Sequence, residues 1–383
     1  MNFDEIIDRR NTESIKWRYF EEDVLPMWIA DMDFQAPEAV IDALHHRVSH
    51  GVFGYGCEPE GLKHAIQDHL ARRQGWVVSE DAISFVSGVV TGFAHAIYSL
   101  TEPGDKVLIQ PPVYRPILIG PESVGRVCLH NPLIRGESGR YEIDFDDFEE
   151  KIASGVKLFL LCNPHNPVGR VFTPGELTKM AEICLKHEVL ICSDEIHADL
   201  IYSGNQHTPI ASLSPEIAAV TVTYFAPSKT FNIAGLSTSV YVAENPSLRK
   251  QLSESMRLIL GHPNVLGMQA ALAAYRDGQE WLGQLLIYLE SNRDFLVDYV
   301  TQELPGVKIW CPEGTFLGWL DCSDLALEPS PQQFFLEHGR VGFNEGKEFG
   351  VGGEGFIRLN FGCPKKMLQE GLERMRSAIV NQK

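Results

Sequence analysis

Apolar and polar positions form two alternating kinds of segment through the middle of the chain. Short runs that are mostly apolar predict strands at 82–86, 106–110, 126–130, 156–162, 189–193, 218–225 and 239–243. Between them, 89–100 and 176–187 have the spacing of helices, and in the second Leu177, Met180 and Cys184 share one face. Apolar strands separated by helices predict an α/β fold whose mostly parallel central sheet is covered on both faces.

The pattern changes after residue 261. Two long helical stretches are predicted at 265–276 and 279–303, followed by a hairpin-like region at 307–321 and a glycine-rich stretch at 346–362. This part predicts a second, smaller α+β domain. The N-terminal residues are assigned to it as well, so the predicted division is 46–282 for the large domain and 1–45 plus 283–383 for the small domain.

Composition narrows the possible partners. The chain has 383 residues, with 33 Lys and Arg against 51 Asp and Glu, a formal net charge of −18. Such a charge argues against a nucleic-acid-binding protein or a polybasic membrane-surface protein. No apolar run reaches the roughly 18 residues of a spanning helix, and the first 30 residues lack the pattern of a signal peptide. Eight scattered cysteines without a CxxC pair predict reduced thiols, and we expect a cytoplasmic protein.

Candidate chemistry follows the predicted strands, since ligands of α/β sheets bind at the carboxyl ends of strands. After 82–86, the sequence Ser87-Gly88-Val89 opens a helix, where small residues and free N–H groups favour an anion such as phosphate. After 156–162, a loop from Asn163 to Gly169 contains two X–Pro bonds, which make it rigid. Either Asn163 or Asn166 could donate from its amide to a ligand oxygen.

An acidic residue and a histidine follow the strand at 189–193. Asp194 at the buried end of a strand needs a partner, and a protonated ring nitrogen would serve. The alternative is a metal site made of Asp194, His197 and Asp199. No second ligand cluster and no HExxH motif accompany these residues, so we expect no metal.

Lys229 follows the strand at 218–225, within Ala226-Pro227-Ser228-Lys229-Thr230. Partial desolvation in this small, apolar setting would lower the pKa of the lysine from its usual value of about 10.4. A neutral amine can attack an aldehyde and form a Schiff base. The alternative is a surface lysine.

Together, a phosphate cradle, an amide, a carboxylate and a lysine at strand ends match the parts of pyridoxal 5′-phosphate in turn. The chain resembles the fold-type I enzymes of the class I/II aminotransferase superfamily, and among them the MalY/PatB-type cystathionine β-lyases. The resemblance covers nearly the whole chain. It rests on the runs 27–34, 53–56, 111–114, 163–169, 194–197, 228–236, 349–350 and 355–361.

The resemblance implies a role for each matching residue. Lys229 would bond the cofactor aldehyde and later move the Cα proton, while Asp194 would keep the ring nitrogen protonated. Arg358 would bind the substrate α-carboxylate, with Trp28 and Asp31 shaping the entrance. The other residues implied to hold the cofactor are Asn166 at its phenolic oxygen, with Asn163 shaping the same loop, Tyr114 stacked on the ring, His197 near the ring, and Gly88, Val89 and Ser228 around the phosphate.

The resemblance also implies a homodimer, in which Tyr55 reaches the phosphate of the other subunit. One departure matters. Many aminotransferases have an arginine eight residues after the lysine, whereas this chain has Ser237. The implied reaction is β-elimination from L-cystathionine or a related cysteine S-conjugate, giving a thiol, pyruvate and ammonia. The alternative is a class I/II aminotransferase, and a non-catalytic cofactor-binding regulatory protein is a more distant one.

Overall fold

The computed structural model describes residues 1–256 and 261–381. Its largest sheet has seven strands, in the order β2 (Ile83–Val86), β10 (Ser239–Val242), β9 (Thr221–Phe225), β8 (Leu190–Asp194), β7 (Val156–Cys162), β3 (Lys106–Ile109) and β4 (Val127–His130). Strand β10 is antiparallel to both of its neighbours, and all other neighbouring pairs are parallel. The predicted α/β fold with a mostly parallel sheet is therefore confirmed.

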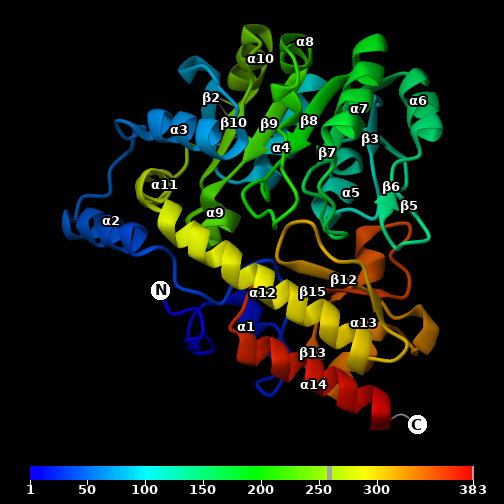
Figure 1. Ribbon diagram of the computed structural model, residues 1–383. Coiled ribbons are helices and arrows are strands. Elements are labelled where there is room, and N and C mark those ends of the chain that lie inside the picture. Colours follow the sequence, from blue (N-terminus) through cyan, green and yellow to red (C-terminus); the bar gives the residue numbers. More distant parts are fainter. Residues whose placement is uncertain (257–260, 382–383) are drawn as a thin grey trace.

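Helices cover both faces of this sheet (Figure 1), which explains why its strands are apolar throughout. In β7, Phe159 and Leu161 join an apolar cluster with helices α6 (Phe145–Ala153) and α7 (Pro174–Lys186). Their neighbours Leu158 and Leu160 point to the opposite face, where they join α4 (Val89–Leu100) and α10 (Pro246–Met256). The sheet thus presents its strand ends as a fixed edge.

The N-terminal and C-terminal parts of the chain form the second, α+β region. Its antiparallel sheet has the order β11 (Lys308–Ile309), β12 (Leu317–Asp321), β15 (Phe356–Asn360) and β14 (Asn344–Glu345). The predicted hairpin corresponds to β11 and β12. The N-terminal strand β1 (Leu25–Pro26) pairs in parallel with β13 (Val341–Gly342). The predicted domain boundary at 282 falls within α12 (Gln279–Glu303), so the division into domains stays a prediction.

Figure 1 shows α12, in yellow, running from the region of α11 toward the C-terminal elements, where it packs against α14, in red. The remaining elements are α1 (Ile15–Arg18), α2 (Glu38–Ser49), α3 (Leu62–Gln74), α5 (Arg115–Ser123), α8 (Pro215–Ala219), α9 (Pro227–Thr230), α11 (Val265–Asp277), α13 (Pro331–Phe334), α14 (Lys365–Asn381), and the hairpin of β5 (Ile134–Arg135) and β6 (Tyr141–Glu142). Within the described ranges, no helix combines the length and apolar character needed to cross a membrane.

One predicted strand began too early. The run 218–225 was expected to be a strand, but its first residues complete helix α8, and β9 begins at Thr221. The reason lies upstream of the apolar run. The Ser214 side chain accepts a hydrogen bond from the backbone N–H of Ile217, and Pro215 occupies the first helical position, so the pair starts a helix there.

Candidate active site

A cavity of about 340 Å³ lies at the carboxyl ends of the central strands, between the first turn of α4 and the short helix α9. Stretches far apart in the sequence line it, among them the first turn of α4, the ends of β7 and β8, helix α9 with the residues that follow it, and strand β15 of the second sheet. Nine of the residues predicted for the site line this one cavity: Gly88, Val89, Tyr114, Asn166, Asp194, His197, Ser228, Lys229 and Arg358.

Lys229 lies on α9, and its Nζ donates a hydrogen bond to the carbonyl oxygen of Ala30 at 2.5 Å. Burial lowers the pKa of Lys229 to about 8, opposed by the negative charges of Asp31 and Asp194. The neutral amine is therefore far more populated near neutral pH than it would be at the ordinary lysine pKa of about 10.4. This is the protonation state that can attack a carbonyl carbon.

Asp194 ends strand β8 with only 3% of its surface exposed. Its carboxylate accepts one hydrogen bond, from the backbone N–H of Ile196 at 3.1 Å. No cation pairs with Asp194 in the described part of the chain, and burial raises its pKa to about 7. A buried carboxylate without a partner fits a ligand that brings a protonated nitrogen.

His197 lies beside the same cavity. Burial, together with the positive charges of Lys229 and Arg358, lowers its pKa to about 3, so the imidazole is neutral. Its Nδ1 has no hydrogen-bond partner, although it is buried. The alternative metal site is not supported by the positions, because Asp199 instead binds His69 at 2.8 Å and Thr230 at 2.9 Å. No group of three metal-ligating side chains gathers anywhere in residues 1–256 or 261–381.

The first turn of α4 suits a phosphate. Gly88 precedes it with φ of +131°, a conformation that favours glycine, and no side chain caps the free N–H groups that follow. Ser228 and Ser237 contribute hydroxyls to the same cavity. Backbone donors at a helix N-terminus together with hydroxyl groups can bind a phosphate without an arginine. The cavity therefore suits two parts of pyridoxal 5′-phosphate: the helix N-terminus and the hydroxyls suit its phosphate, and Asp194 suits its ring nitrogen.

Arg358 closes the opposite side of the cavity from strand β15. It is 3% exposed and donates to Asn166 Oδ1 at 3.0 Å, Asn344 Oδ1 at 2.6 Å and the Trp28 carbonyl oxygen at 3.1 Å. Its Nε has no partner, and no carboxylate pairs with it among the described residues. Burial lowers the pKa of Arg358 to about 10. A buried guanidinium bonded only to neutral oxygens can bind an incoming carboxylate.

Four residues predicted for the site do not line the cavity. Asn163 accepts a hydrogen bond from the backbone N–H of Phe172 at 3.0 Å, which shapes the loop that holds Asn166. Trp28 takes part through its carbonyl oxygen, while its indole donates to the Lys16 carbonyl oxygen at 3.1 Å. The remaining two are Asp31, which faces Arg9, and Tyr55, whose side chain is fully exposed in the segment between α2 and α3.

Sequence reasoning missed two contributors. Asn344 reaches Arg358 because β14 and β15 pair with these two residues opposite each other. No motif marks it, and only the register of the two strands could have identified it. The second is the Ala30 carbonyl oxygen, which binds Lys229 through the backbone, so its side chain carries no signal.

The sequence pattern of the family described as aminotransferase class I and II matches residues 22–375. The chain belongs to that family. Within it, the chain belongs with the MalY/PatB-type cystathionine β-lyases. Cystathionine β-lyase PatB of Bacillus subtilis is 45% identical to it over 99% of this chain and 100% of that protein.

Solved structures of the family have the same fold. Cystalysin of Treponema denticola, which contains pyridoxal 5′-phosphate, superposes with a TM-score of 0.96 and 34% identity over 100% of this chain and 99% of that one. A pyridoxal-phosphate-bound protein of Clostridium difficile 630, described provisionally as an aminotransferase, gives a TM-score of 0.96 and 42% identity over 99% of both chains.

Proposed function

We propose that the protein is a carbon–sulfur β-lyase that acts on L-cystathionine or a related cysteine S-conjugate. The observation that carries the proposal is the set of three charged groups in one cavity. Lys229 supplies an amine of lowered pKa, and the buried charges of Asp194 and Arg358 lack counterions. An amino acid and a pyridine-containing cofactor together complement this set of charges. Two similar proteins are named cystathionine β-lyases, and these names indicate that the reaction is β-elimination.

The cofactor is pyridoxal 5′-phosphate. When bound, it supplies an aldehyde for the substrate amino group and a ring that withdraws electrons from Cα. Asp194 keeps a proton on the ring nitrogen, which preserves this electron withdrawal. The N-terminus of α4 and Ser228, which line the cavity, would bind its phosphate, Asn166 would donate to its phenolic oxygen, and Tyr114 would contact its ring.

The side chains of the protein perform the remaining steps. Arg358 binds the α-carboxylate and fixes the orientation of the substrate. Lys229, once its amine is free, takes the proton from Cα. The Cβ–S bond then breaks, and the sulfur leaves as a thiolate, a fair leaving group because the pKa of a thiol is about 8.5. Uptake of one water molecule completes the conversion of the remaining fragment into pyruvate and ammonia.

The alternative is transamination, which uses the same Lys229, Asp194 and Arg358. The Clostridium difficile protein, which is 42% identical, is described as an aminotransferase, and this description favours transamination. Two features favour elimination: Ser237 stands where many aminotransferases have an arginine, and the relative at 45% identity is a cystathionine β-lyase.

Incubation with L-cystathionine in the absence of any keto acid separates the two functions. We expect sustained release of pyruvate, ammonia and homocysteine, and no release by a Lys229→Ala variant. Turnover that stops after one equivalent and resumes only when a keto acid is added would identify an aminotransferase. The substitution Lys186→Ala is a matched control, because Lys186 lies on the surface and pairs with Glu149 at 2.6 Å.

The proposal includes a cytoplasmic homodimer that takes part in methionine biosynthesis. Support for the dimer comes from the segment between α2 and α3, where Val52, Phe53 and Tyr55 are 61%, 57% and 110% exposed. Apolar side chains this exposed within one short segment suit a surface covered by a second subunit. In such a dimer, Tyr55 reaches the phosphate of the partner's site.

A further inference from the structure

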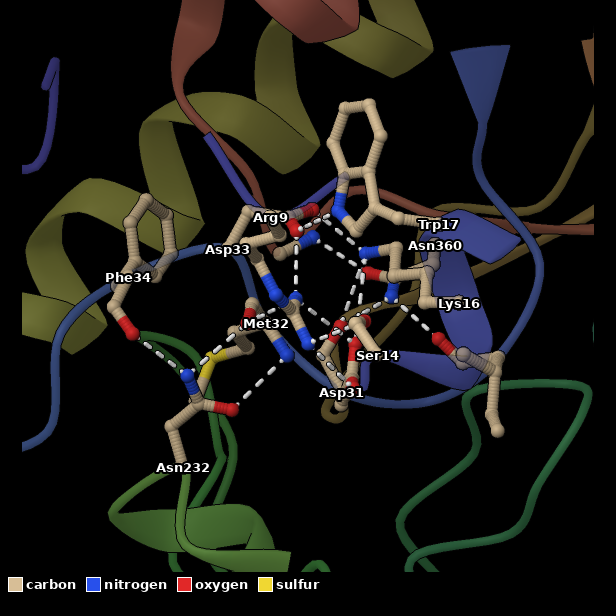
Figure 2. Close-up of polar contacts among 12 residues, drawn as sticks. Arg9, Ser14, Lys16, Trp17, Asp31, Met32, Asp33, Phe34, Asn232 and Asn360 are labelled. Atoms are coloured by element: carbon tan, nitrogen blue, oxygen red, sulfur yellow. Dashed lines mark hydrogen bonds and ion pairs between the residues drawn. The ribbon is translucent and has the colours of Figure 1, made fainter. Parts of the chain in front are cut away.

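The segment from Ile29 to Phe34 crosses the site without regular secondary structure, yet its carbonyl oxygens are bonded by side chains (Figure 2). The donors come from three distant parts of the chain. The bonds are Asn360 Nδ2 to the oxygens of Ile29 and Asp31, both at 2.7 Å, Lys16 Nζ to Asp31 at 3.0 Å, Arg9 Nη1 to Met32 at 3.2 Å, and Asn232 Nδ2 to Met32 at 2.9 Å and Phe34 at 2.7 Å.

Between the bonded carbonyls of Ile29 and Asp31 lies that of Ala30, which accepts the hydrogen bond from Lys229 at 2.5 Å. Its two neighbours, Ile29 and Asp31, are both bonded to Asn360. The peptide units around Ala30 therefore have little freedom to turn. Asn232 lies three residues after Lys229 and binds the same segment, so the lysine and its acceptor are fixed to each other from two sides.

Two cationic side chains form ion pairs with the two carboxylates of this segment. Arg9 pairs with Asp31 at 2.9 Å and with Asp33 at 2.6 Å, and Lys16 pairs with Asp33 at 2.6 Å and with Asp31 at 3.7 Å. The side chains of Lys16 and Asp33 are 1% and 2% exposed, whereas that of Asp31 is 23% exposed. Of the two carboxylates, Asp31 is the one whose charge acts on Lys229.

Among the described residues, three charged side chains act on the Lys229 amine, and His197, Tyr114 and Cys162 line the same cavity as uncharged titratable groups. Asp31 and Asp194 are negative and favour its protonated form, and Arg358 is positive and opposes it. The imidazole of His197 is neutral. Asp194 and Arg358 are needed for the cofactor and the substrate, so Asp31 is the charge that can be changed without altering either.

We propose that Asp31 is a positioning residue for Lys229: with Arg9 it fixes the Ala30 carbonyl oxygen as the acceptor of the lysine amine, and its own charge sets how readily that amine holds a proton. The proposal rests on the proposed function, in which Lys229 must be free and neutral to bond an aldehyde and then to accept a proton. It gives Asp31 a role that requires no contact with substrate.

Substitutions on the two sides of the ion pair should act in opposite directions. Asp31→Asn removes the negative charge, so the pH at which the Lys229 amine titrates should fall by about half a unit. Arg9→Gln leaves Asp31 less neutralised, so this midpoint should rise by about half a unit. Glu13→Gln is the matched control, because Glu13 is exposed, lines an adjoining cavity near Asp31, and makes no hydrogen bond to the segment in the described structure.

The readout is the rate at which the apoenzyme recombines with pyridoxal phosphate from pH 6 to 10, followed by absorbance, since the neutral amine is the attacking form. We expect opposite shifts for Asp31→Asn and Arg9→Gln, and none for Glu13→Gln. Loss of folding alone cannot produce shifts of opposite sign. Steady-state kinetics should show kcat reduced by about tenfold in Asp31→Asn, because the Lys229 amine loses its orientation. KM should stay within about twofold, because the contacts with substrate are kept.

Two failures are distinguishable. If borohydride reduction of the recombined enzyme does not label Lys229, the proposed function is wrong. If Lys229 is labelled but both variants titrate as the unsubstituted protein does, or if Asp31→Asn changes KM and leaves kcat intact, the positioning role of Asp31 is wrong and the proposed function stands.

Discussion

The substitution Arg358→Lys tests how the cavity binds an α-carboxylate. The guanidinium has five N–H groups, of which three are bonded to Asn166, Asn344 and the Trp28 carbonyl, which leaves two for a ligand. A hydrogen bond to a charged group contributes about 1.5–3 kcal/mol. Lysine keeps the charge but cannot make these three bonds and still offer two donors to a ligand, so we expect a loss of about 2–3 kcal/mol, or roughly 30- to 150-fold in kcat/KM.

The assay pairs kinetics with binding. Pyruvate release from L-cystathionine gives kcat/KM, and spectral titration of the cofactor-bound enzyme compares L-alanine with ethylamine, which differ only in the carboxylate. The unsubstituted protein should prefer L-alanine strongly, and Arg358→Lys should lose most of that preference. Equal weakening for both ligands would refute the carboxylate role. Arg293→Lys is the control, because Arg293 pairs with Glu290 and Asp294 away from the cavity.

Three further predictions follow from the same geometry. Borohydride reduction should attach the cofactor to Lys229, as peptide mapping can determine, and Lys229→Ala should bind it only non-covalently; a label on another lysine would contradict the site. Burial raises the folded-state pKa of Asp194 to about 7, so its protonated form stabilises the apoenzyme at low pH and this stability is lost as the pH rises through about 7. The apoenzyme should therefore unfold at a temperature several degrees lower at pH 8 than at pH 5, and calorimetry should show a smaller change in Asp194→Asn, which should also lose most activity. Mixing inactive Tyr55→Ala and Lys229→Ala chains should restore activity through hybrid dimers, and a fully active monomer at low concentration would exclude a shared site.

The features that the sequence predicted correctly depend on local pattern. The strand 156–162 was recognisable because both of its faces are buried, which makes it apolar throughout. Lys229 and Asp194 were recognisable because each directly follows or ends such a strand, and parallel strands bring their carboxyl ends to one edge of the sheet. Their presence in one cavity agrees with that expectation, while their chemical roles stay predictions.

The features that could not be predicted depend on long-range placement. Asn344 binds Arg358 through the register of an antiparallel pair, which nothing in the local sequence specifies. The ion pair of Arg9 with Asp31 joins residues from an irregular segment, where no periodicity indicates neighbours. The start of β9 was misjudged because Ser214 and Pro215 begin a helix that extends into the apolar run.

The bonding of the N-terminal segment also has a consequence for the order of events during synthesis. The backbone of Met27 bonds to Gly342 and Asn360, and Asp33 bonds to Gly362, so this early segment is held by residues made more than 300 positions later. At ~5–20 residues per second, roughly 15–65 s separate the two. Over that interval the side chains of Met27, Met32 and Phe34, which are 1%, 1% and 6% exposed in the finished fold, are without their final partners. The large sheet can form on the ribosome in this time, but the acceptor for the Lys229 amine is fixed only when the last strand of the second sheet has emerged.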